Sequence, residues 1–244
     1  MLDYKSKYKT LFILALLISA CGQVSQTVDN TSFDNNGLIS DSLQTFSITR
    51  ATVEDFTKAK GLYKDKLIED TLNIKKKNGI IEIPLNQPHY PPSIIFKDTL
   101  IGIEETEESQ YYYLGHFLDL ELYLVSGTFW EHYECYLINK ESGSKTTTWS
   151  MPYLSPTSKY FANLSLPYGL EGVPNGIQIW RIEPNSRGNL SKYLELDQQI
   201  WAPDDFVWET DNSIIIKVIA IENYYNETDQ PNENDFYYLR IKIK

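Results

Sequence analysis

The chain has few cysteines and few histidines, and each shortage narrows the chemistry that it can carry. Its two cysteines, Cys21 and Cys135, allow at most one internal disulfide bond. Its three histidines are far apart in the sequence, whereas a zinc site needs three or four ligands close together; they are His89, His116 and His132. We therefore expect no metal ion and no other cofactor.

Positive charge is also scarce. The 22 lysines and arginines are outnumbered by 33 aspartates and glutamates, which gives a formal net charge of −11 at pH 7. One basic cluster after the N-terminal segment, Lys75–Lys77, fits a solvated turn. Since nucleic-acid binding depends on many clustered basic residues, we do not expect it here. An acidic surface instead favours a basic protein partner, with binding that weakens as salt rises.

The sequence contains no apolar run of the roughly 20 residues that a transmembrane helix needs. The apolar run Leu11–Ile18 is much shorter, and the small residues Ser19 and Ala20 follow it. It is preceded by three basic residues, Lys5, Lys7 and Lys9. This order of charge, apolar run and small residues is typical of a secretory signal peptide.

The tetrapeptide Ile18–Cys21 resembles the lipobox of bacterial lipoproteins. In that family the cysteine thiol receives a diacylglyceryl group, the signal peptide is cut just before it, and the new amine is acylated, for example with palmitate. The resemblance implies a signal peptide over residues 1–20, lipidation of Cys21 and a cell-envelope location facing the periplasm. Gly22 favours the outer over the inner membrane, and two or more acyl chains make the anchor stable. The alternative is an ordinary secretory signal with a chance cysteine.

The mature chain divides into a tether and one domain. Residues 21–49 are rich in Ser, Thr, Asn, Asp and Gln, which predicts a flexible tether. Residues 50–244 form the predicted domain. It begins with Thr52 and Asp55 at the spacing of a capping box, followed by apolar residues at helical spacing, so we expect one short N-terminal helix.

After this helix, strand signals dominate. Asn78-Gly79 lies between two alternating runs and predicts a hairpin. Later runs of β-branched and aromatic residues are each bounded by Gly, Pro, Asn, Asp or Ser, and none is followed by an amphipathic helix. The fold class is therefore all-β: a sandwich, a barrel or a propeller.

The later part of the domain contains internal similarity. The segment Pro152–Leu166 aligns with Asp205–Ile219, each reading as an apolar lead-in, a polar turn and an apolar strand. The segments Ile177–Glu183 and Phe236–Lys242 align with each other, and Tyr133–Asn139 fits the same place one unit earlier. Repetition at this scale is typical of propeller blades.

The segment Leu154–Ala162 is similar to the F-S-P-D-G-K-x-[IL]-A signature of TolB-type and other WD-like β-propeller repeats. Thr157 and Ser158 replace the usual Asp and Gly. The resemblance implies a propeller-like domain of four or five blades, in a complete or incomplete ring, with Ser158 in a left-handed conformation. A β-sandwich with similar hairpins is the alternative.

No residue is assigned a catalytic role, because no nucleophile or phosphate-loop motif is present. Cys135 alternates with apolar residues and is predicted to be a buried strand residue. The candidate binding residues are large side chains on predicted loops, Trp130, Trp149, Tyr168 and Leu170. Core packing is the alternative for these aromatics. The preferred function is a non-enzymatic, lipid-anchored protein-binding module. It is either an assembly scaffold or an immunity-type protein, which inhibits a toxin or a hydrolase.

The alternative function is an envelope hydrolase or glycan binder that works through carboxylates around a propeller mouth. The first candidates are Asp119, Glu121, Glu131 and Glu134. For His116 and His132, which flank a predicted strand pair, the alternatives are a shared metal site and polar strand ends, and we favour polar strand ends.

Overall fold

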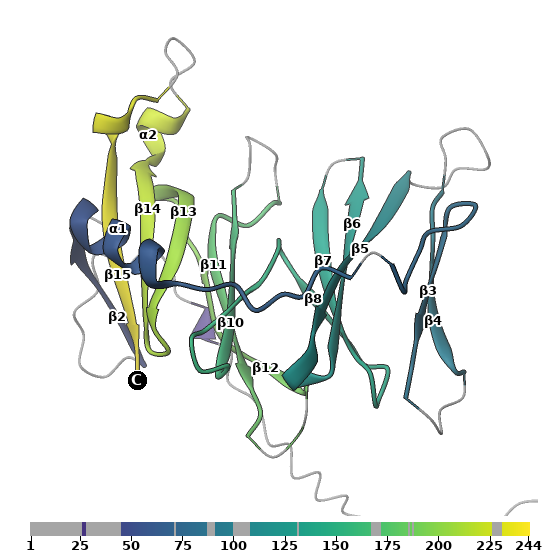
Figure 1. Ribbon diagram of the computed structural model, residues 1–244. Helices are drawn as coiled ribbons and strands as arrows, with labels where there is room; N and C mark the ends of the chain where they lie inside the picture. Colours follow the sequence, from purple (N-terminus) through teal and green to yellow (C-terminus); the bar gives the residue numbers. More distant parts are fainter. Residues whose placement is uncertain are drawn as a thin grey trace, which may run out of the picture.

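The structure is a computed structural model, and it describes residues 26–27, 45–70, 72–86, 91–99, 108–130, 132–166, 172–184, 186, 188–225 and 231–244. Strands make up most of these residues, so the predicted all-β class is confirmed. The strands form four separate sheets that stand side by side in a row (Figure 1). Among the described residues, no helix has the length and apolar character needed to cross a membrane.

The first two sheets come from the first half of the domain. Sheet I consists of β3 (Ile80–Pro84) and β4 (Ser93–Lys97), which pair antiparallel. Sheet II is a four-stranded meander of β5 (Ser109–Phe117), β6 (Leu122–Phe129), β7 (Tyr133–Asn139) and β8 (Lys145–Thr148). A short 3-10 helix, η2 (Leu118–Leu120), joins β5 to β6.

Sheets III and IV each take a strand from the N-terminal part. Sheet III contains β9 (Tyr153–Leu154), β10 (Tyr160–Ser165), β11 (Gly176–Ile182) and β12 (Leu190–Asp197), with β1 (Gln26–Thr27) parallel to β12. Sheet IV contains β13 (Trp201–Thr210), β14 (Ser213–Ala220), β15 (Phe236–Ile243) and β2 (Phe46–Ala51). The helices α2 (Ile221–Tyr224) and η3 (Glu233–Asp235) lie between β14 and β15.

The aligned sequence segments occupy equivalent strands. The hairpins β9–β10 and β13–β14 are the first two strands of sheets III and IV, and β7, β11 and β15 are each the third strand of their sheets. The folded part starts slightly earlier than residue 50, because β2 begins at Phe46. Both Phe46 and Ile48 are fully buried, so the end of the predicted tether belongs to sheet IV.

Neighbouring sheets pack face to face around three apolar cores. Sheets III and IV enclose the largest, with Trp201 and Trp208. Sheets II and III share Phe117 and Phe161, whose rings lie 4.9 Å apart. Sheets I and II meet through a smaller cluster of Ile81, Ile83, Phe96 and Tyr136.

The predicted short helix is confirmed as α1 (Val53–Leu62). The Thr52 hydroxyl accepts from the Asp55 backbone N–H at 3.1 Å, and the Asp55 carboxylate accepts from the Thr52 N–H, which forms the capping box. Phe56 and Ala59 are buried against Ile215 of β14. Ile215 points away from the core shared with sheet III, so α1 covers the outer face of sheet IV.

The described residues form no closed propeller, and α1 covers the face of sheet IV that a closing sheet would need. A ring needs its first and last sheets to pack together, but α1 lies on the outer face of sheet IV (Figure 1). At the other end of the row, the outer face of sheet I is exposed, with Ile95 63% exposed. The described residues therefore form an open row of sheets, and they contain no closed propeller or barrel.

The residues after α1 run across the row from sheet IV toward sheet I (Figure 1). The Tyr63 hydroxyl donates to the Leu154 carbonyl at 3.0 Å. The Lys66 Nζ donates to the Pro156 carbonyl at 2.6 Å, and Ile68 then forms a bridge with His116 of sheet II. This segment ties the middle sheets together along one side.

Two polar turns behave as their residues predict. Ser158 adopts φ 62°, the left-handed conformation expected at the glycine position. The buried Ser155 hydroxyl accepts from the N–H groups of Lys159 and Tyr160 at 3.0 and 3.1 Å. Asn78-Gly79 also forms a left-handed turn, but β3 then pairs with β4, so the residues before this turn do not form the predicted hairpin strand.

Because the sheets are meanders, their connections fall at two ends. The turns between first and second and between third and fourth strands lie at one end, here called the turn end. The connections between second and third strands, and those leading to the next sheet, lie at the opposite end, here called the loop end. The loop end is at the top of Figure 1, where α2 lies.

Candidate functional site

A pocket of about 680 Å³ opens at the loop end of sheets II, III and IV. It lies where β8 and β10 end and where β7, β11 and β13 begin. The lining residues are His132, Tyr133, Glu134, Thr147, Thr148, Trp149, Ser150, Leu164, Ser165, Leu166, Gly172, Val173, Pro174, Pro203 and Asp204. Three sheets are needed to build it, so its existence depends on the stacking of the row.

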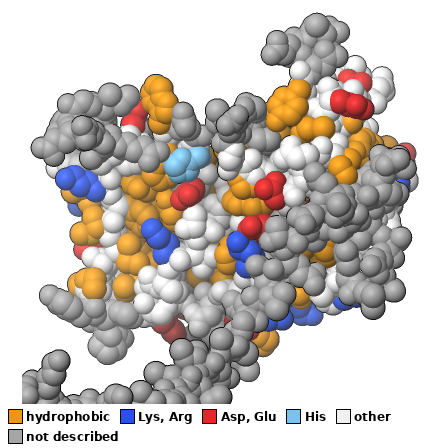
Figure 2. Space-filling model, turned by 180° about the vertical axis from the view of Figure 1, so that it is seen from behind, with side chains coloured by type: hydrophobic (Ala, Val, Ile, Leu, Met, Phe, Trp, Pro, Cys, Tyr) orange, Lys and Arg blue, Asp and Glu red, His pale blue; other side chains and the backbone are white. Residues whose placement is uncertain are grey.

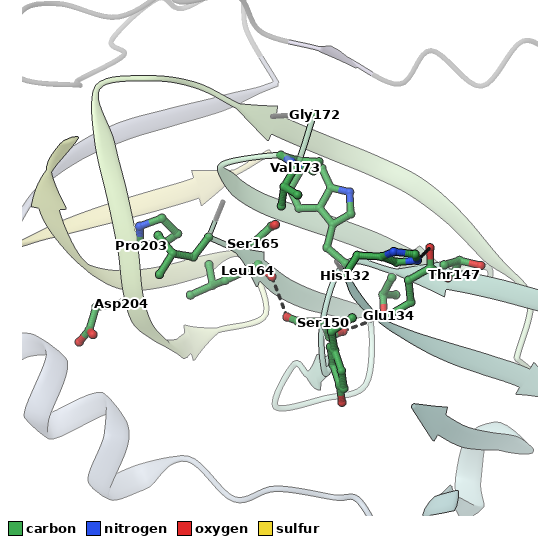
Figure 3. A pocket seen from close by; sticks show the side chains of 15 residues that line it. His132, Glu134, Thr147, Ser150, Leu164, Ser165, Gly172, Val173, Pro203 and Asp204 are labelled. Atoms are coloured by element: carbon green, nitrogen blue, oxygen red, sulfur yellow. Dashed lines mark hydrogen bonds and ion pairs between the residues drawn. The ribbon is translucent and has the colours of Figure 1, made fainter. Parts of the chain in front are cut away.

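The two sides of the pocket differ in chemistry. Figure 3 shows His132, Glu134 and Thr147 on one side and Pro203 with Asp204 on the other, with Ser150 and Leu164 between them. Apolar side chains contribute from sheets III and IV, namely Leu164, Leu166, Val173, Pro174 and Pro203. The pocket therefore combines apolar side chains with a few polar groups, as specific binding sites commonly do.

The floor of the pocket is fixed by hydrogen bonds between sheets II and III. The Ser150 hydroxyl donates to the Leu164 carbonyl at 2.7 Å, and the Thr148 hydroxyl donates to the Ser150 carbonyl at 2.8 Å (Figure 3). The Trp149 backbone N–H donates to the Gln178 side-chain oxygen at 3.3 Å. These bonds hold the chain that carries Trp149 against sheet III.

The layer beneath the floor is polar, although it lies between two sheets. Asn163 is fully buried, and its side-chain oxygen accepts from the Ser150 N–H at 3.3 Å, but its Nδ2 has no hydrogen-bond partner. Gln178 donates to Glu195 at 2.8 Å. An unpaired buried donor costs about 1–3 kcal/mol. The interface between sheets II and III is thus apolar at the turn end and has unused hydrogen-bonding capacity at the loop end.

Two carboxylates, those of Glu134 and Asp204, line the pocket, and no lysine or arginine is among its lining residues. Glu134 accepts from the Tyr136 hydroxyl at 2.8 Å and lies 3.8 Å from His132 Nε2. Asp204 lies 3.1 Å from the Lys217 Nζ. Burial lowers the pKa of Lys217, but the hydrogen bonds and charges of Asp204 and Glu233 together outweigh burial, so the pKa is raised overall. Lys217 therefore stays charged beside the pocket.

The face of the molecule shown in Figure 2 carries charges of both signs. Seen from behind, acidic and basic side chains are interspersed with apolar ones. The acidic character of the site is therefore local to the pocket. Of its two carboxylates, Glu134 is the one that has no lysine or arginine partner among the described residues.

The predicted binding residues have different outcomes. Trp149 lines the pocket. Trp130 is 71% exposed at the loop end but is not part of the lining. Tyr168 and Leu170 lie outside the described residues, as does Cys21, so the structure says nothing of their positions.

The predicted carboxylate cluster is not formed. Asp119 and Glu121 lie at the turn end, between β5 and β6, whereas Glu134 pairs with Gly127 near the other end of β6. At about 3.3 Å per residue along β6, Glu121 and Glu134 are therefore about 20 Å apart. Glu131 lies outside the described residues. This constellation cannot act as one catalytic site.

The histidines are not brought together either. His116 pairs with Tyr123 toward the turn end, while His132 stacks on Phe129 at the loop end, with ring centroids 4.3 Å apart. His116 and His132 therefore do not share a site. His89 lies outside the described residues, and the part of the chain that the structure describes contains no group of three or more metal-binding side chains.

Cys135 is a buried strand residue, as its alternating sequence predicts. It is fully buried, and its thiol donates to the Tyr133 hydroxyl at 3.3 Å. Burial raises the pKa of the thiol to about 11. The thiol is therefore protonated at neutral pH and is a poor nucleophile.

Several residues that line the pocket were not predicted from the sequence, because no motif or spacing relates them to one another. Leu164 and Ser165 end one strand, and Pro203 and Asp204 lie in the first half of another. One signal was available, since a proline within a strand indicates an edge where the ladder needs no N–H donor. Pro203 lies on β13, which is the edge strand of sheet IV and borders the pocket.

The fold and the site together define an all-β protein with an open row of sheets and one mixed apolar and acidic pocket at their loop end. No family model, curated protein or solved structure matches the chain. Its function is therefore inferred from the site and from the N-terminal sequence.

Proposed function

We propose that the mature chain is a lipid-anchored, non-enzymatic binding protein of a bacterial cell envelope, a scaffold or an inhibitor of immunity type. Lipidation of Cys21 holds it at the membrane, facing the periplasm and preferentially on the outer membrane. Sheets II, III and IV act as blades of a degenerate, open propeller, supported by their common strand order and by β2, which completes the last sheet. The loop-end pocket binds a basic partner protein.

The observation that carries this proposal is the composition of the pocket. It combines Trp149 and an apolar wall with Glu134 and Asp204, and its lining has no lysine or arginine. A lysine or arginine side chain of a partner fits these requirements, because its aliphatic stem packs on apolar surface while its charged end reaches a carboxylate. Trp149 supplies contact area, and Glu134 supplies charge selectivity.

The test uses a photo-crosslinking amino acid at Ser165 of the lipidated protein in its native host. We expect a crosslinked basic envelope protein that, once purified, binds the mature chain in a salt-sensitive manner. Trp149→Ala should weaken this binding at least tenfold and Glu134→Gln severalfold. The matched control Glu141→Gln removes an exposed carboxylate at the turn end and should have no effect. If Glu134→Gln and Glu141→Gln weakened binding equally, the pocket would not be the site that binds the partner.

The anchor is tested separately. Radiolabelled palmitate should be incorporated into the wild-type chain and not into Cys21→Ser, which should appear in the soluble periplasmic fraction. Recovery of an unprocessed, soluble cytosolic chain would overturn the envelope location without bearing on the pocket.

A second candidate, glycan binding, is favoured by one observation: the aromatic residues Tyr133 and Trp149 line the same pocket as the carboxylates Glu134 and Asp204. Aromatic faces and carboxylates are general features of sugar sites. Calorimetric titration with soluble peptidoglycan fragments tests this candidate. Saturable binding lost in Trp149→Ala would replace the basic partner protein with a glycan.

A further inference from the structure

A second concave surface lies at the far end of the row from α1. A groove of about 800 Å³ runs over the outer face of β3 and is bordered on one side by the segment Leu72–Lys77. Its lining residues are Leu72, Asn73, Ile74, Lys75, Lys77, Ile80, Glu82, Pro84, Leu85, Pro92 and Ser93. None of these residues lines the loop-end pocket, so the two sites are independent.

The groove is open to solvent, and both apolar and polar side chains line it. Ile80, Glu82 and Pro84 alternate along β3 and are exposed, whereas Ile81 and Ile83 face the core. Ile80 is 37% exposed and Leu72, on the opposite side of the groove, is 78% exposed. The alternate side chains of a strand are about 6.6 Å apart. The exposed side of β3 therefore presents a row about 13 Å long, which matches five residues of an extended chain.

The charge of the groove is opposite to that of the whole protein. Lys75 and Lys77 are exposed and have no ion pair with any residue that the structure describes. Lys76 already forms an ion pair, since its Nζ lies 2.6 Å from the Asp98 carboxylate. The carboxylate in the groove, Glu82, accepts a hydrogen bond from the Ser93 hydroxyl at 2.7 Å. A groove with two free lysines on a chain of net charge −11 is a local basic site.

We propose that this groove binds an extended, acidic and apolar segment of a partner protein. Acidic side chains of the segment pair with Lys75 and Lys77, and its apolar side chains cover Leu72 and Ile80. Charge complementarity favours this occupant over the same face of a second copy, which would bring lysines against lysines. The concave shape favours a single extended chain over a lipid bilayer, which would contact only the rim.

The probe is a fluorescein-labelled nine-residue peptide of alternating glutamate and valine, and the control probe has lysine in place of glutamate. Both are titrated against the full mature chain carrying Cys21→Ser, with fluorescence anisotropy as the measurement. We expect saturable binding of the acidic probe, no binding of the basic probe, and weakening as salt rises.

The decisive variant is Lys75→Glu with Lys77→Glu, which should weaken binding of the acidic probe at least tenfold. The matched control, Lys58→Glu with Lys64→Glu, makes the same change of charge at exposed positions in and just after α1 and should change binding less than twofold. Trp149→Ala should also leave it unchanged, so failure here and failure of the proposed function are distinguishable.

Four results would overturn the proposal. They are no binding of the acidic probe at millimolar concentration, equal binding of both probes, equal weakening by both double variants, and binding to anionic phosphatidylglycerol vesicles in place of the peptide. A dimer detected by sedimentation and lost in Lys75→Glu with Lys77→Glu would assign the groove to a second copy instead.

Discussion

The two ends of the row of sheets differ in how their outer faces are covered. Sheet IV has four strands, and α1 packs Phe56 and Ala59 on its outer face. Among the described residues, sheet I has two strands, and its outer face carries exposed Ile80 and Ile95. Both sheets bury one face against a neighbour. The second face of a terminal sheet is therefore either covered, by a helix or by a partner, or exposed to solvent.

The covered end is also fastened by charge. Arg240 of β15 donates to both carboxylate oxygens of Glu209 at 2.9 and 3.0 Å, and it lies 2.9 Å from Asp55 of α1. At the open end, Lys76 and Asp98 form a single ion pair. The outer face of the C-terminal sheet is therefore covered and tied down by α1, whereas the outer face of sheet I carries exposed apolar side chains.

The largest expected effect is on the covered end. Phe56→Ala removes the ring that α1 packs 5.1 Å from Tyr238, which should lower the free energy of unfolding by about 3–5 kcal/mol. Because β2 and α1 are continuous in sequence, we expect the loss to destabilise sheet IV as a whole. Urea unfolding followed by tryptophan fluorescence measures it, since Trp201 and Trp208 lie in the core on the inner face of sheet IV. A loss below about 1 kcal/mol would show that α1 is a loosely attached cover.

At the open end, Phe96→Ala should have a comparable but local effect. Phe96 packs against Tyr111 and Tyr136 with ring centroids 5.2 and 5.5 Å apart, and its loss should cost about 3 kcal/mol. We expect faster hydrogen exchange in β3 and β4 and unchanged exchange in β14, because sheet I is held through one face alone. Equal acceleration in both sheets would mean that the two ends unfold as one unit.

A smaller effect is expected from Arg240→Met, and it should depend on pH. The hydrogen bond from Arg240 lowers the pKa of Asp55. Burial raises the pKa of Glu209, but its hydrogen bonds from Arg240 and Ser213 prevail and lower it below its ordinary value of 4.5. Carboxylates with lowered pKa stabilise the fold above the unfolded pKa, and this contribution disappears as pH falls through the folded pKa.

Arg240→Met should therefore lose about 1 kcal/mol at pH 7, and the difference from wild type should shrink as the pH falls below about 4.5. Chemical unfolding at a series of pH values measures this dependence. The control is Arg181→Met, which breaks a longer and more exposed pair with Glu183 and should have little effect at any pH. A constant loss down to pH 3 would show that Arg240 acts through packing alone.

The smallest expected effect is from Lys60→Met. Lys60 forms an ion pair between α1 and Asp205, and both side chains are exposed to solvent. Exposed pairs contribute little because solvent screens them, so the change in free energy of unfolding should be below about 0.5 kcal/mol. Thermal unfolding at low and high salt checks it. A loss as large as that of Arg240→Met would show that charge, and not packing, attaches α1.

Much of the local structure could be predicted from the sequence. The capping box at Thr52 and Asp55 forms, and Ser158 takes the left-handed conformation that was predicted for it in the polar turn. Trp149, a candidate binding residue because of its place on a predicted loop, lines the pocket. These features depend on residues close together in the chain, where propensity and turn geometry act directly.

The pocket as a whole could not be predicted. Leu164, Pro203 and Glu134 come from three sheets, and no spacing in the sequence relates them. For the same reason Asp119 and Glu121 were wrongly grouped with Glu134, since the length of a strand separates them. Which ends of which strands meet is decided by the order and packing of the sheets.

The sequence by itself determined the all-β class, the short helix, the polar turns and the equivalent strands of successive sheets, because period-two patterns and capping residues act over a few positions. The tertiary structure alone decided that the sheets form an open row. Closure of a ring depends on contact between the first and last sheets. Here α1 buries Phe56 and Ala59 against the outer face of sheet IV, and that face is no longer free to receive another sheet.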